Sequence, residues 1–275
     1  MSACSPVVQA FPACFPAGYT VAMETTKYLR QRAEQGDSDA LFRLGHRLTF
    51  SRNRPRPPDW AAVLEFWEQA ARLGHDRAMF YIGVCFEHGN GVPQDTAQAL
   101  AWYEKAAQLG HEAAMYNLAF SYRNGDGVPQ DYEKMRFWLV KAAKRGDAPA
   151  QRDLGWCCHE GVGMPLDYIA AVRWYRASAR QGDTKAQYNL GLSYLDGDGV
   201  KVSGRWARHW LQKAAQQGHR ASKARLKRLF SADLDAAYRA LGQDAAGEAE
   251  ALEWVEGTLS GIDGEDEEEN FLAEQ

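Results

Sequence analysis

The seven histidines are the side chains of this sequence that could bind a metal ion or act as general bases. Three of them hold the same place in a repeated pattern and lie multiples of 36 residues apart: His75, His111 and His219. Ligands of one ion must converge within about 2 Å of it, which residues separated by whole repeats cannot do. The other four lie in different units, and none forms a His-Glu-x-x-His motif: His46, His88, His159 and His209. The histidines therefore predict no metal site.

The adjacent Cys157 and Cys158 could form a redox pair, but the repeated pattern gives a simpler explanation. Other units place small side chains where Cys157 stands, Cys85, Ser121 and Ser193. They place large aromatic ones where Cys158 stands, Phe86, Tyr122 and Tyr194. Because a free cysteine behaves as a small hydrophobe, both are predicted to be core residues. The five cysteines of the chain include no Cys-x-x-Cys spacing, which favours a reducing compartment.

Glycine-rich loops recur along the chain and could cradle a phosphate: Gly89–Gly91, Gly125–Gly127 and Gly197–Gly199. Each of them links two helical patterns, and none continues into the Lys-Ser/Thr pair of a P-loop. The sequence also lacks a Gly-x-Ser-x-Gly motif and any strand pattern that would present a nucleophile. The loops are therefore predicted to be structural turns. The chain is predicted to be no enzyme, with no catalytic residue, no cofactor and no metal.

A 36-residue repeat sets the elements that position all of these residues. Its glycine row is Gly74, Gly110, Gly146, Gly182 and Gly218, and Gly36 precedes the row by 38 residues. A tryptophan row follows the same step, with Phe66 at the matching place: Trp102, Trp138, Trp174 and Trp210. A row of helix caps does so too, Asp59, Asp95, Asp131, Asp167 and Ser203, as does an aliphatic row, Leu44, Ile82, Leu118, Leu154 and Leu190. Four rows in one register predict a repeat protein.

Each unit is predicted to form two helices. The first begins after the repeat glycine at an Asp or a His, and Asp is a good N-cap there. In the second, such as residues 99–107, apolar positions recur at helical spacing. Small residues such as Gly83 and Gly155 let the first helix approach its partner closely, while the tryptophan row fills the gap between pairs. Since one pair cannot bury both faces, the pairs are predicted to stack into an all-α, right-handed superhelical solenoid of about five repeats with C-terminal capping helices.

The unit resembles a known repeat. It contains Ala-x-x-x-Leu-Gly, Tyr-x-x-Gly-x-Gly-Val, a capping Asp, Ala-x-x-Trp and Lys-Ala-Ala-x-x-Gly. This pattern is similar to the Sel-one-like repeat (SLR) family, a branch of the tetratricopeptide-like α-solenoids, over about residues 36–226. The first unit departs from the pattern, because residues 51–58 replace its glycine turn and add two residues. The fifth has Ser203 in place of the capping Asp.

The resemblance implies a concave groove lined by the first helix of each pair. Counted from the aliphatic row, positions −2, −1, +2 and +5 are expected to face it: Phe80, Tyr81, Val84, Glu87, Tyr116, Asn117, Phe120, Arg123, Arg152, Asp153, Trp156, His159, Tyr188, Asn189, Leu192 and Leu195. Aromatic anchors beside polar side chains suit a recognition surface. Packing between the helices is the alternative for some of these residues, Tyr81 and Tyr188 above all.

The predicted function is protein binding. The leading hypothesis is a non-catalytic bacterial adaptor or scaffold that holds a segment of another protein in the groove, as the family implies. The alternative is an immunity protein that neutralises a secreted toxic effector, a role in which arrays of this family also occur. An enzyme regulatory subunit has no feature in its support.

Charge is divided unevenly along the chain. The net charge is −4, but residues 232–275 hold 14 acids and one Arg, so they carry −13 and the preceding residues +9. Asp263 to Glu269 places six acids in seven positions, a run that is expected to stay solvated. The predicted division is a disordered segment 1–22, with Met23 as a second candidate start, a solenoid 23–231, amphipathic helices 232–260 and an acidic disordered tail 261–275.

The tail has two interpretations, a passive solubilising segment or an intramolecular partner of five cations: Arg220, Lys223, Arg225, Lys227 and Arg228. In the second interpretation it competes with ligands of those cations or of the groove. Because the acidic tail opposes phosphate binding, no nucleic-acid partner is expected. No apolar run is long enough for a membrane helix. The lack of an export signal favours cytoplasmic localisation.

Overall fold

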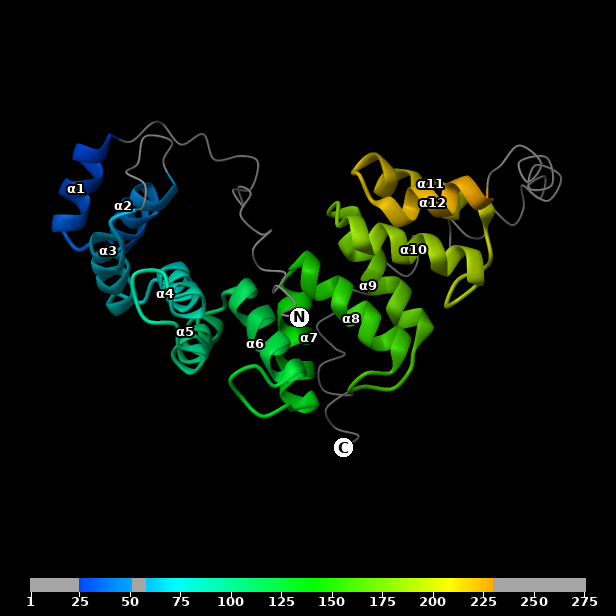
Figure 1. Ribbon diagram of the computed structural model, residues 1–275, viewed down its shortest axis with the longest axis horizontal. Helices are drawn as coiled ribbons and strands as arrows, with labels where there is room; N and C mark the ends of the chain where they lie inside the picture. The colour runs from blue at the N-terminus through cyan, green and yellow to red at the C-terminus, as the bar shows by residue number, and fades with distance from the viewer. Residues whose placement is uncertain (1–24, 51–57, 230–275) are drawn as a thin grey trace. The chain divides into compact units, whose positions relative to one another are not determined.

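The computed structural model describes residues 25–50 and 58–229, and within these ranges it contains twelve α-helices and no strand (Figure 1). The helices are α1 (Thr26–Glu34), α2 (Ser38–Phe50), α3 (Trp60–Arg72), α4 (Asp76–His88), α5 (Thr96–Gln108), α6 (Glu112–Asn124), α7 (Tyr132–Lys144), α8 (Ala148–Glu160), α9 (Tyr168–Arg180), α10 (Thr184–Asp196), α11 (Gly204–Gln216) and α12 (Arg220–Leu229). The predicted all-α fold of about five helix-turn-helix repeats is confirmed.

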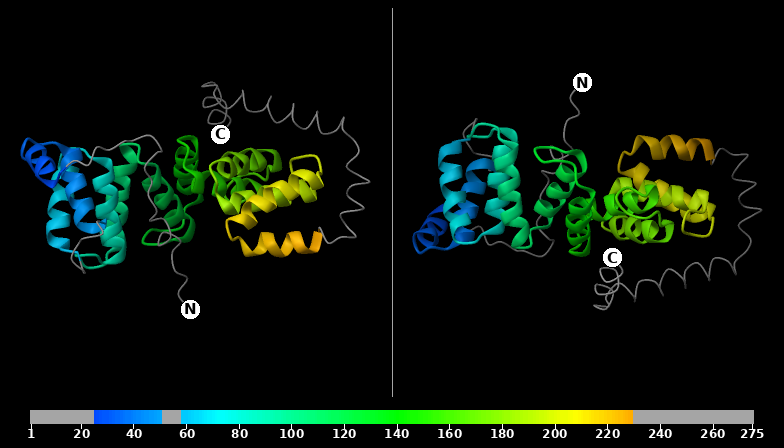
Figure 2. Two further views of the ribbon diagram at one scale, coloured as in Figure 1. Left: turned by 90° about the horizontal axis from the view of Figure 1, so that it is seen from above. Right: turned by 90° about the horizontal axis from the view of Figure 1, so that it is seen from below.

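The chain divides into two compact units, unit 1 up to Leu109 and unit 2 from Gly110. Unit 1 contains α1–α5 and unit 2 contains α6–α12. Within each unit the helices pack as hairpins, α2 with α3 and α4 with α5 in unit 1, then α6 with α7, α8 with α9 and α10 with α11 in unit 2 (Figure 2). Helix α1 precedes the first hairpin and packs on α2, and α12 follows the last and packs on α11.

The helix caps lie where the repeated pattern predicts them. Asp183 accepts the backbone N–H of Ala186 at 2.7 Å at the start of α10. Ser203 accepts the N–H of Trp206 at 3.4 Å at the start of α11, so serine does fill the place of the capping Asp. Histidine at this position is itself a cap, because Nδ1 of His75 accepts the N–H of Ala78 at 3.2 Å. Only an unprotonated Nδ1 can accept that bond, so capping by His75 requires the neutral ring.

The cap of α4 makes the stability of unit 1 depend on pH. Burial lowers the pKa of His75 below its usual 6.5, Asp76 and Asp39 oppose that shift, and Arg77 adds to it. Because the unfolded chain binds this proton more readily, stability is lost as the pH falls below about 6.5. We expect His75→Asn, a cap that does not titrate, to lose less stability than the unchanged chain between about pH 7 and about pH 5. Urea midpoints measure both losses, and equal losses would contradict this role of His75.

The two helices of a hairpin approach closely where the first helix carries glycine. A Cβ on Gly155 would lie 2.7 Å from Cδ1 of Tyr175, and one on Gly83 would lie 2.6 Å from Cε1 of Tyr103. The predicted close approach is thus confirmed. The second helices place a row of buried side chains against this position of the first helices. The row lies one residue after the tryptophan row: Trp67, Tyr103, Leu139, Tyr175 and Leu211. Leu139 belongs to the repeat in which Ala119 replaces the glycine, whereas Leu211 lies opposite Gly191.

Three of the four tryptophans of the row lie at the margin of the core, whereas Trp210 is buried in the core of unit 2 at 7% exposure. Trp102 packs against the core of unit 1 and Trp174 against that of unit 2, but both remain partly exposed. A lysine covers the outer side of three of these rings, and the Lys105 ammonium lies 4.2 Å from the ring centroid of Trp102. The row therefore joins apolar packing to a solvated cationic surface.

Buried glutamines connect successive repeats of unit 2. The side chain of Gln151 donates to the carbonyl of Ala143 at 3.0 Å, and Gln181 donates to Oε1 of Gln151 at 2.8 Å. One repeat later Gln217 donates to Oε1 of Gln187 at 2.9 Å. These bonds hold the first helix of one repeat to the ends of the second helices on either side of it.

Residues 1–24, 51–57 and 230–275 lie outside the described ranges. The predicted disordered start, the C-terminal amphipathic helices 232–260 and the acidic tail 261–275 all fall there, so those boundaries stay predictions. Among the helices that the structure does describe, none combines the length and apolar character that crossing a membrane requires.

Candidate functional site

The first helices of two successive repeats in unit 2 bring six predicted groove residues together. We call this set the α6–α8 cluster, and its members are Tyr116, Phe120, Arg123, Arg152, Asp153 and Trp156. The α6 members stand at −2, +2 and +5 from Leu118, and the α8 members stand at −2, −1 and +2 from Leu154. Side-chain contacts join the two helices directly, so these residues lie on facing sides of α6 and α8.

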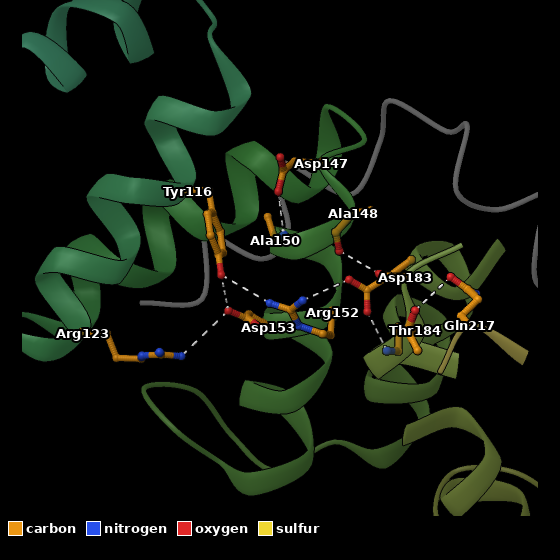
Figure 3. Close-up of polar contacts among 12 residues, drawn as sticks. Tyr116, Arg123, Asp147, Ala148, Ala150, Arg152, Asp153, Asp183, Thr184 and Gln217 are labelled. Atoms are coloured by element: carbon orange, nitrogen blue, oxygen red, sulfur yellow. Dashed lines mark hydrogen bonds and ion pairs between the residues drawn. The ribbon is translucent and has the colours of Figure 1, made fainter. Parts of the chain in front are cut away.

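One half of the cluster is a polar network centred on Arg152 (Figure 3). Its guanidinium donates to Asp153 at 2.7 Å, to Asp183 at 3.0 Å and to the hydroxyl of Tyr116 at 3.3 Å. The Tyr116 hydroxyl in turn donates to Asp153 at 2.8 Å, and Arg123 lies 4.0 Å from the same carboxylate. The side chains of Arg152, Asp153 and Asp183 are 15%, 17% and 14% exposed, so this is a largely buried network.

The network fixes the charges of its members. Burial lowers the pKa of Arg152, but the carboxylates of Asp153 and Asp183 outweigh burial and raise it overall. Burial raises the pKa of Tyr116, and the negative charge of Asp153 raises it further, so the phenol stays neutral and acts as a donor. Asp183 also caps α10, so one carboxylate joins the network to the next repeat. The side chains of the network are thereby held in place before any ligand binds.

The other half of the cluster is aromatic. The guanidinium of Arg123 lies 4.9 Å from the ring centroid of Phe120 and 5.7 Å from that of Trp156. Trp156 is 37% exposed, which is unusual for a tryptophan in a helical core. Arg123 donates at 3.4 Å to the side chain of Asn124. A guanidinium has five N–H donors in a fixed geometry. This half therefore combines an exposed aromatic side chain with a cation that can donate hydrogen bonds to a ligand.

The remaining predicted residues of unit 2 flank the cluster. His159 lies with Nε2 3.3 Å from Asp198 and Nδ1 3.0 Å from Glu160. Tyr188 packs against His219, with ring centroids 4.8 Å apart, in keeping with the alternative of helix packing. The other three are half-buried along α10, and Leu195 packs against the core: Asn189, Leu192 and Leu195.

Asn117 is the member of the predicted set that is most deeply buried in unit 2, at 8% exposure. Its side-chain nitrogen has no hydrogen-bond partner in the part of the chain that the structure describes. The equivalent Asn189 is bonded to the phenol of Tyr175. Tyr103, two places before Tyr175 in the same row, donates to Glu87 at 2.6 Å instead.

In unit 1 the predicted residues lie on α4 and join a larger aromatic group. Tyr81 packs 5.2 Å from the ring of Trp67 and 5.5 Å from that of Phe80, so it is shared between core and surface. Val84 is 5% exposed and offers little surface, and Glu87 accepts the Tyr103 hydroxyl. The alternative of helix packing is therefore observed for Tyr81.

Sequence reasoning missed three members of this aromatic group on α2. They are Phe42, His46 and Phe50, whose rings lie 5.7, 6.1 and 6.0 Å from Tyr81. The signal was present in the sequence, because Phe42 and His46 stand at −2 and +2 from Leu44, the aliphatic-row residue of the first repeat. The irregular turn at residues 51–58 lengthens that repeat by two residues and breaks the 36-residue step.

The side chains of the α6–α8 cluster and of the aromatic group on α2 and α4 are suited to binding a ligand through aromatic contacts and hydrogen bonds. Burial raises the pKa of the Cys157 and Cys158 thiols to about 12 and about 11, so neither is a nucleophile near neutral pH. Cys158 packs against Met164 in the core, as the repeat pattern predicts. Within residues 25–50 and 58–229, no group of three His, Cys, Asp or Glu side chains is placed to hold a metal ion.

Comparisons with known proteins agree with this architecture. A family model described as Sel1 repeat matches residues 64–75, 76–111, 112–147, 148–183 and 184–219. A protective antigen of uropathogenic Escherichia coli with an SLR fold is 32% identical, with a TM-score of 0.69, over 74% of this chain and 44% of the antigen. A Sel1 repeat protein from Oxalobacter formigenes is 33% identical, with a TM-score of 0.69, over 74% and 59% of the two chains. The chain thus spans about half the length of these two proteins.

An immunity protein from Pseudomonas aeruginosa is 25% identical over 71% of each chain, with a TM-score of 0.45. The comparison with curated proteins found no match.

Proposed function

Because the chain belongs to the Sel1 repeat family, whose members are protein-interaction scaffolds, we propose that it is a non-catalytic adaptor that binds a segment of another protein. The proposed binding surface is the α6–α8 cluster of unit 2. The observation that carries the proposal is Trp156, a 37% exposed indole beside a guanidinium that lies over two aromatic rings. Interfaces concentrate their binding energy in such aromatic and arginine anchors.

The polar network supports the proposal through preorganisation. Arg152 is held by three hydrogen-bond partners, and two of them also contact each other. A surface whose side chains are already fixed loses less conformational entropy when a ligand binds. The Arg152 network lies beside Arg123 and Trp156, because Asp153 of the network is 4.0 Å from Arg123, which contacts the Trp156 ring.

The donors of Arg123 indicate which groups of a partner they would meet. A guanidinium accepts no hydrogen bond, so its ligands are carbonyl or carboxylate oxygens. A partner segment that places an apolar side chain on Trp156 and an acceptor on Arg123 satisfies both halves of the cluster.

We expect Trp156→Ala and Arg123→Ala each to weaken partner capture at least about tenfold, as hot-spot residues do. Bacterial lysate passed over the immobilised full chain identifies the captured protein, and titration with the purified partner gives the affinities. Phe137→Ala is the matched control, because Phe137 is a 50% exposed aromatic residue of α7, outside the cluster. Circular dichroism checks that each variant keeps its helices.

Unchanged affinity in both cluster variants would place the binding face elsewhere, and equal losses in the control would show a general effect of aromatic truncation. The identity of the captured protein also separates a scaffold from an immunity protein, which stays a prediction from the sequence. Cytoplasmic localisation likewise stays a prediction.

A further inference from the structure

Helix α12 is the most basic surface of unit 2. Its ten residues include five cations and no acid. Four of the five are exposed: Arg220, Lys223, Lys227 and Arg228. Arg220, Lys223 and Lys227 stand at i, i+3 and i+7, so they line one face of the helix.

The opposite side of α12 is the one that packs on unit 2. Ser222 is fully buried, and the Nδ1 of His219 accepts its backbone N–H at 3.2 Å. Leu226 and Leu229 are half-buried on the same side. Packing therefore fixes the direction in which the basic face points, which is toward solvent.

The described part of the chain supplies no acidic partner for this face. No ion pair within 4.0 Å joins any α12 cation to a carboxylate of residues 25–50 or 58–229. The buried Nε of Arg225 has no hydrogen-bond partner there either. A further cation, Lys185, lies close enough to lower the pKa of His219, after the larger effect of burial. Within the described residues, α12 thus presents positive charge that no carboxylate pairs.

The sequence contains a segment of opposite charge that is long enough to span α12. Residues 263–269 hold six acids in seven positions. Extended, seven residues span about 23 Å, and a ten-residue helix is about 15 Å long. Residues 230–262 connect the two, and these 33 residues are enough chain for the run to reach α12.

We propose that the acidic run 263–269 binds the outer face of α12 in the same chain and shields it from other acidic ligands. Exposed ion pairs are individually weak and are screened by salt. The contact is therefore expected to form at low ionic strength and to weaken at high ionic strength. The contact lies at a surface distinct from the α6–α8 cluster, so the proposed tail contact and the proposed adaptor function can be tested independently.

Carbodiimide cross-linking of the full chain tests the contact directly, because it joins a lysine amine to a carboxylate with no spacer. We expect cross-links from Lys223 and Lys227 to residues 263–269 at about 20 mM salt and their loss at about 500 mM. Their yield is expected not to change with protein concentration. Absence of these cross-links at low salt would overturn the proposal. A yield that rises with concentration would also overturn it, because the tail would then bind a second copy.

Competition with a free acidic probe tests the shielding. In the tail-neutral variant the six acids of 263–269 are replaced by Asn or Gln. We expect it to bind a polyglutamate peptide at least about tenfold more tightly than the unchanged chain at low salt, because a tethered competitor acts at high effective concentration. Lys223→Gln with Lys227→Gln is expected to remove the difference, whereas Lys134→Gln with Lys141→Gln on α7 is expected to keep it.

Equal polyglutamate affinity with and without the six acids would overturn the proposal. A single-stranded DNA oligonucleotide is the second probe. If the unchanged chain binds it as tightly as the tail-neutral variant does, then α12 is an open nucleic-acid surface and the proposal is wrong.

Discussion

Replacing Gly155 with alanine is expected to destabilise unit 2 by about 2 kcal/mol, the usual size of an overpacking penalty. The added methyl would lie 2.7 Å from Cδ1 of Tyr175 and 3.0 Å from the carbonyl oxygen of Ala171. Both distances are shorter than van der Waals contact, so α8 and α9 must separate. Alanine favours a helix over glycine by about 1 kcal/mol, so a net loss would show that packing outweighs propensity. The urea midpoint followed by circular dichroism measures the change.

The neighbouring repeat supplies the compensating change. There Ala119 and Leu139 occupy the places of Gly155 and Tyr175, and both are buried, at 1% and 3% exposure. We therefore expect Tyr175→Leu to recover about 1 kcal/mol when it is added to Gly155→Ala, a coupling typical of residues in contact. The Ala171 carbonyl contact remains, so recovery is partial. Strictly additive effects would contradict the close approach of the two helices.

Replacing Arg152 with alanine is expected to cost about 3 kcal/mol, because it leaves two largely buried carboxylates without their cation. Arg152 donates to Asp153 and Asp183, which lie on α8 and at the start of α10. Arg152→Met keeps most of the alkyl packing, so its loss of stability isolates the contribution of the charge. Urea midpoints of both variants give the comparison.

Asp183→Asn provides the matched test of that explanation. Asparagine caps a helix about as well as aspartate, so the bond to Ala186 is kept while one negative charge is removed. In the Arg152→Ala background we expect Asp183→Asn to restore part of the lost stability, whereas alone it is expected to destabilise. If it destabilises to the same extent in both backgrounds, the ion pair is not what holds the two repeats together.

Much of this fold could be predicted because the repeat places each residue type under one physical constraint. The cap row, including Ser203, and the close approach at Gly83 and Gly155 follow from spacing alone. The six members of the α6–α8 cluster are among the sixteen residues selected by counting offsets, but the offsets did not predict that these six would meet.

The side-chain contacts of the hairpins and of the α6–α8 cluster could not be predicted, because they depend on side-chain direction, which residue spacing does not determine. The side chains that fill the space between the two helices of a hairpin lie one residue after the tryptophans. Tyr103 and Tyr175 of that row contact the glycines of the first helices, Gly83 and Gly155. The sequence also does not reveal that Arg152 would reach Asp183, since that bond joins a helix to the cap of the next repeat. The aromatic residues of α2 were missed for a different reason, the irregular turn that follows them.

Amide hydrogen exchange of the chain with and without its captured partner is the most direct test of the central claim that the first helices of the repeats present the binding surface. We predict that the partner slows exchange in Tyr116–Asn124 of α6 and Arg152–Glu160 of α8, while α7 and α9 exchange as before. Protection confined to α7 and α9, with α6 and α8 unchanged, would contradict it.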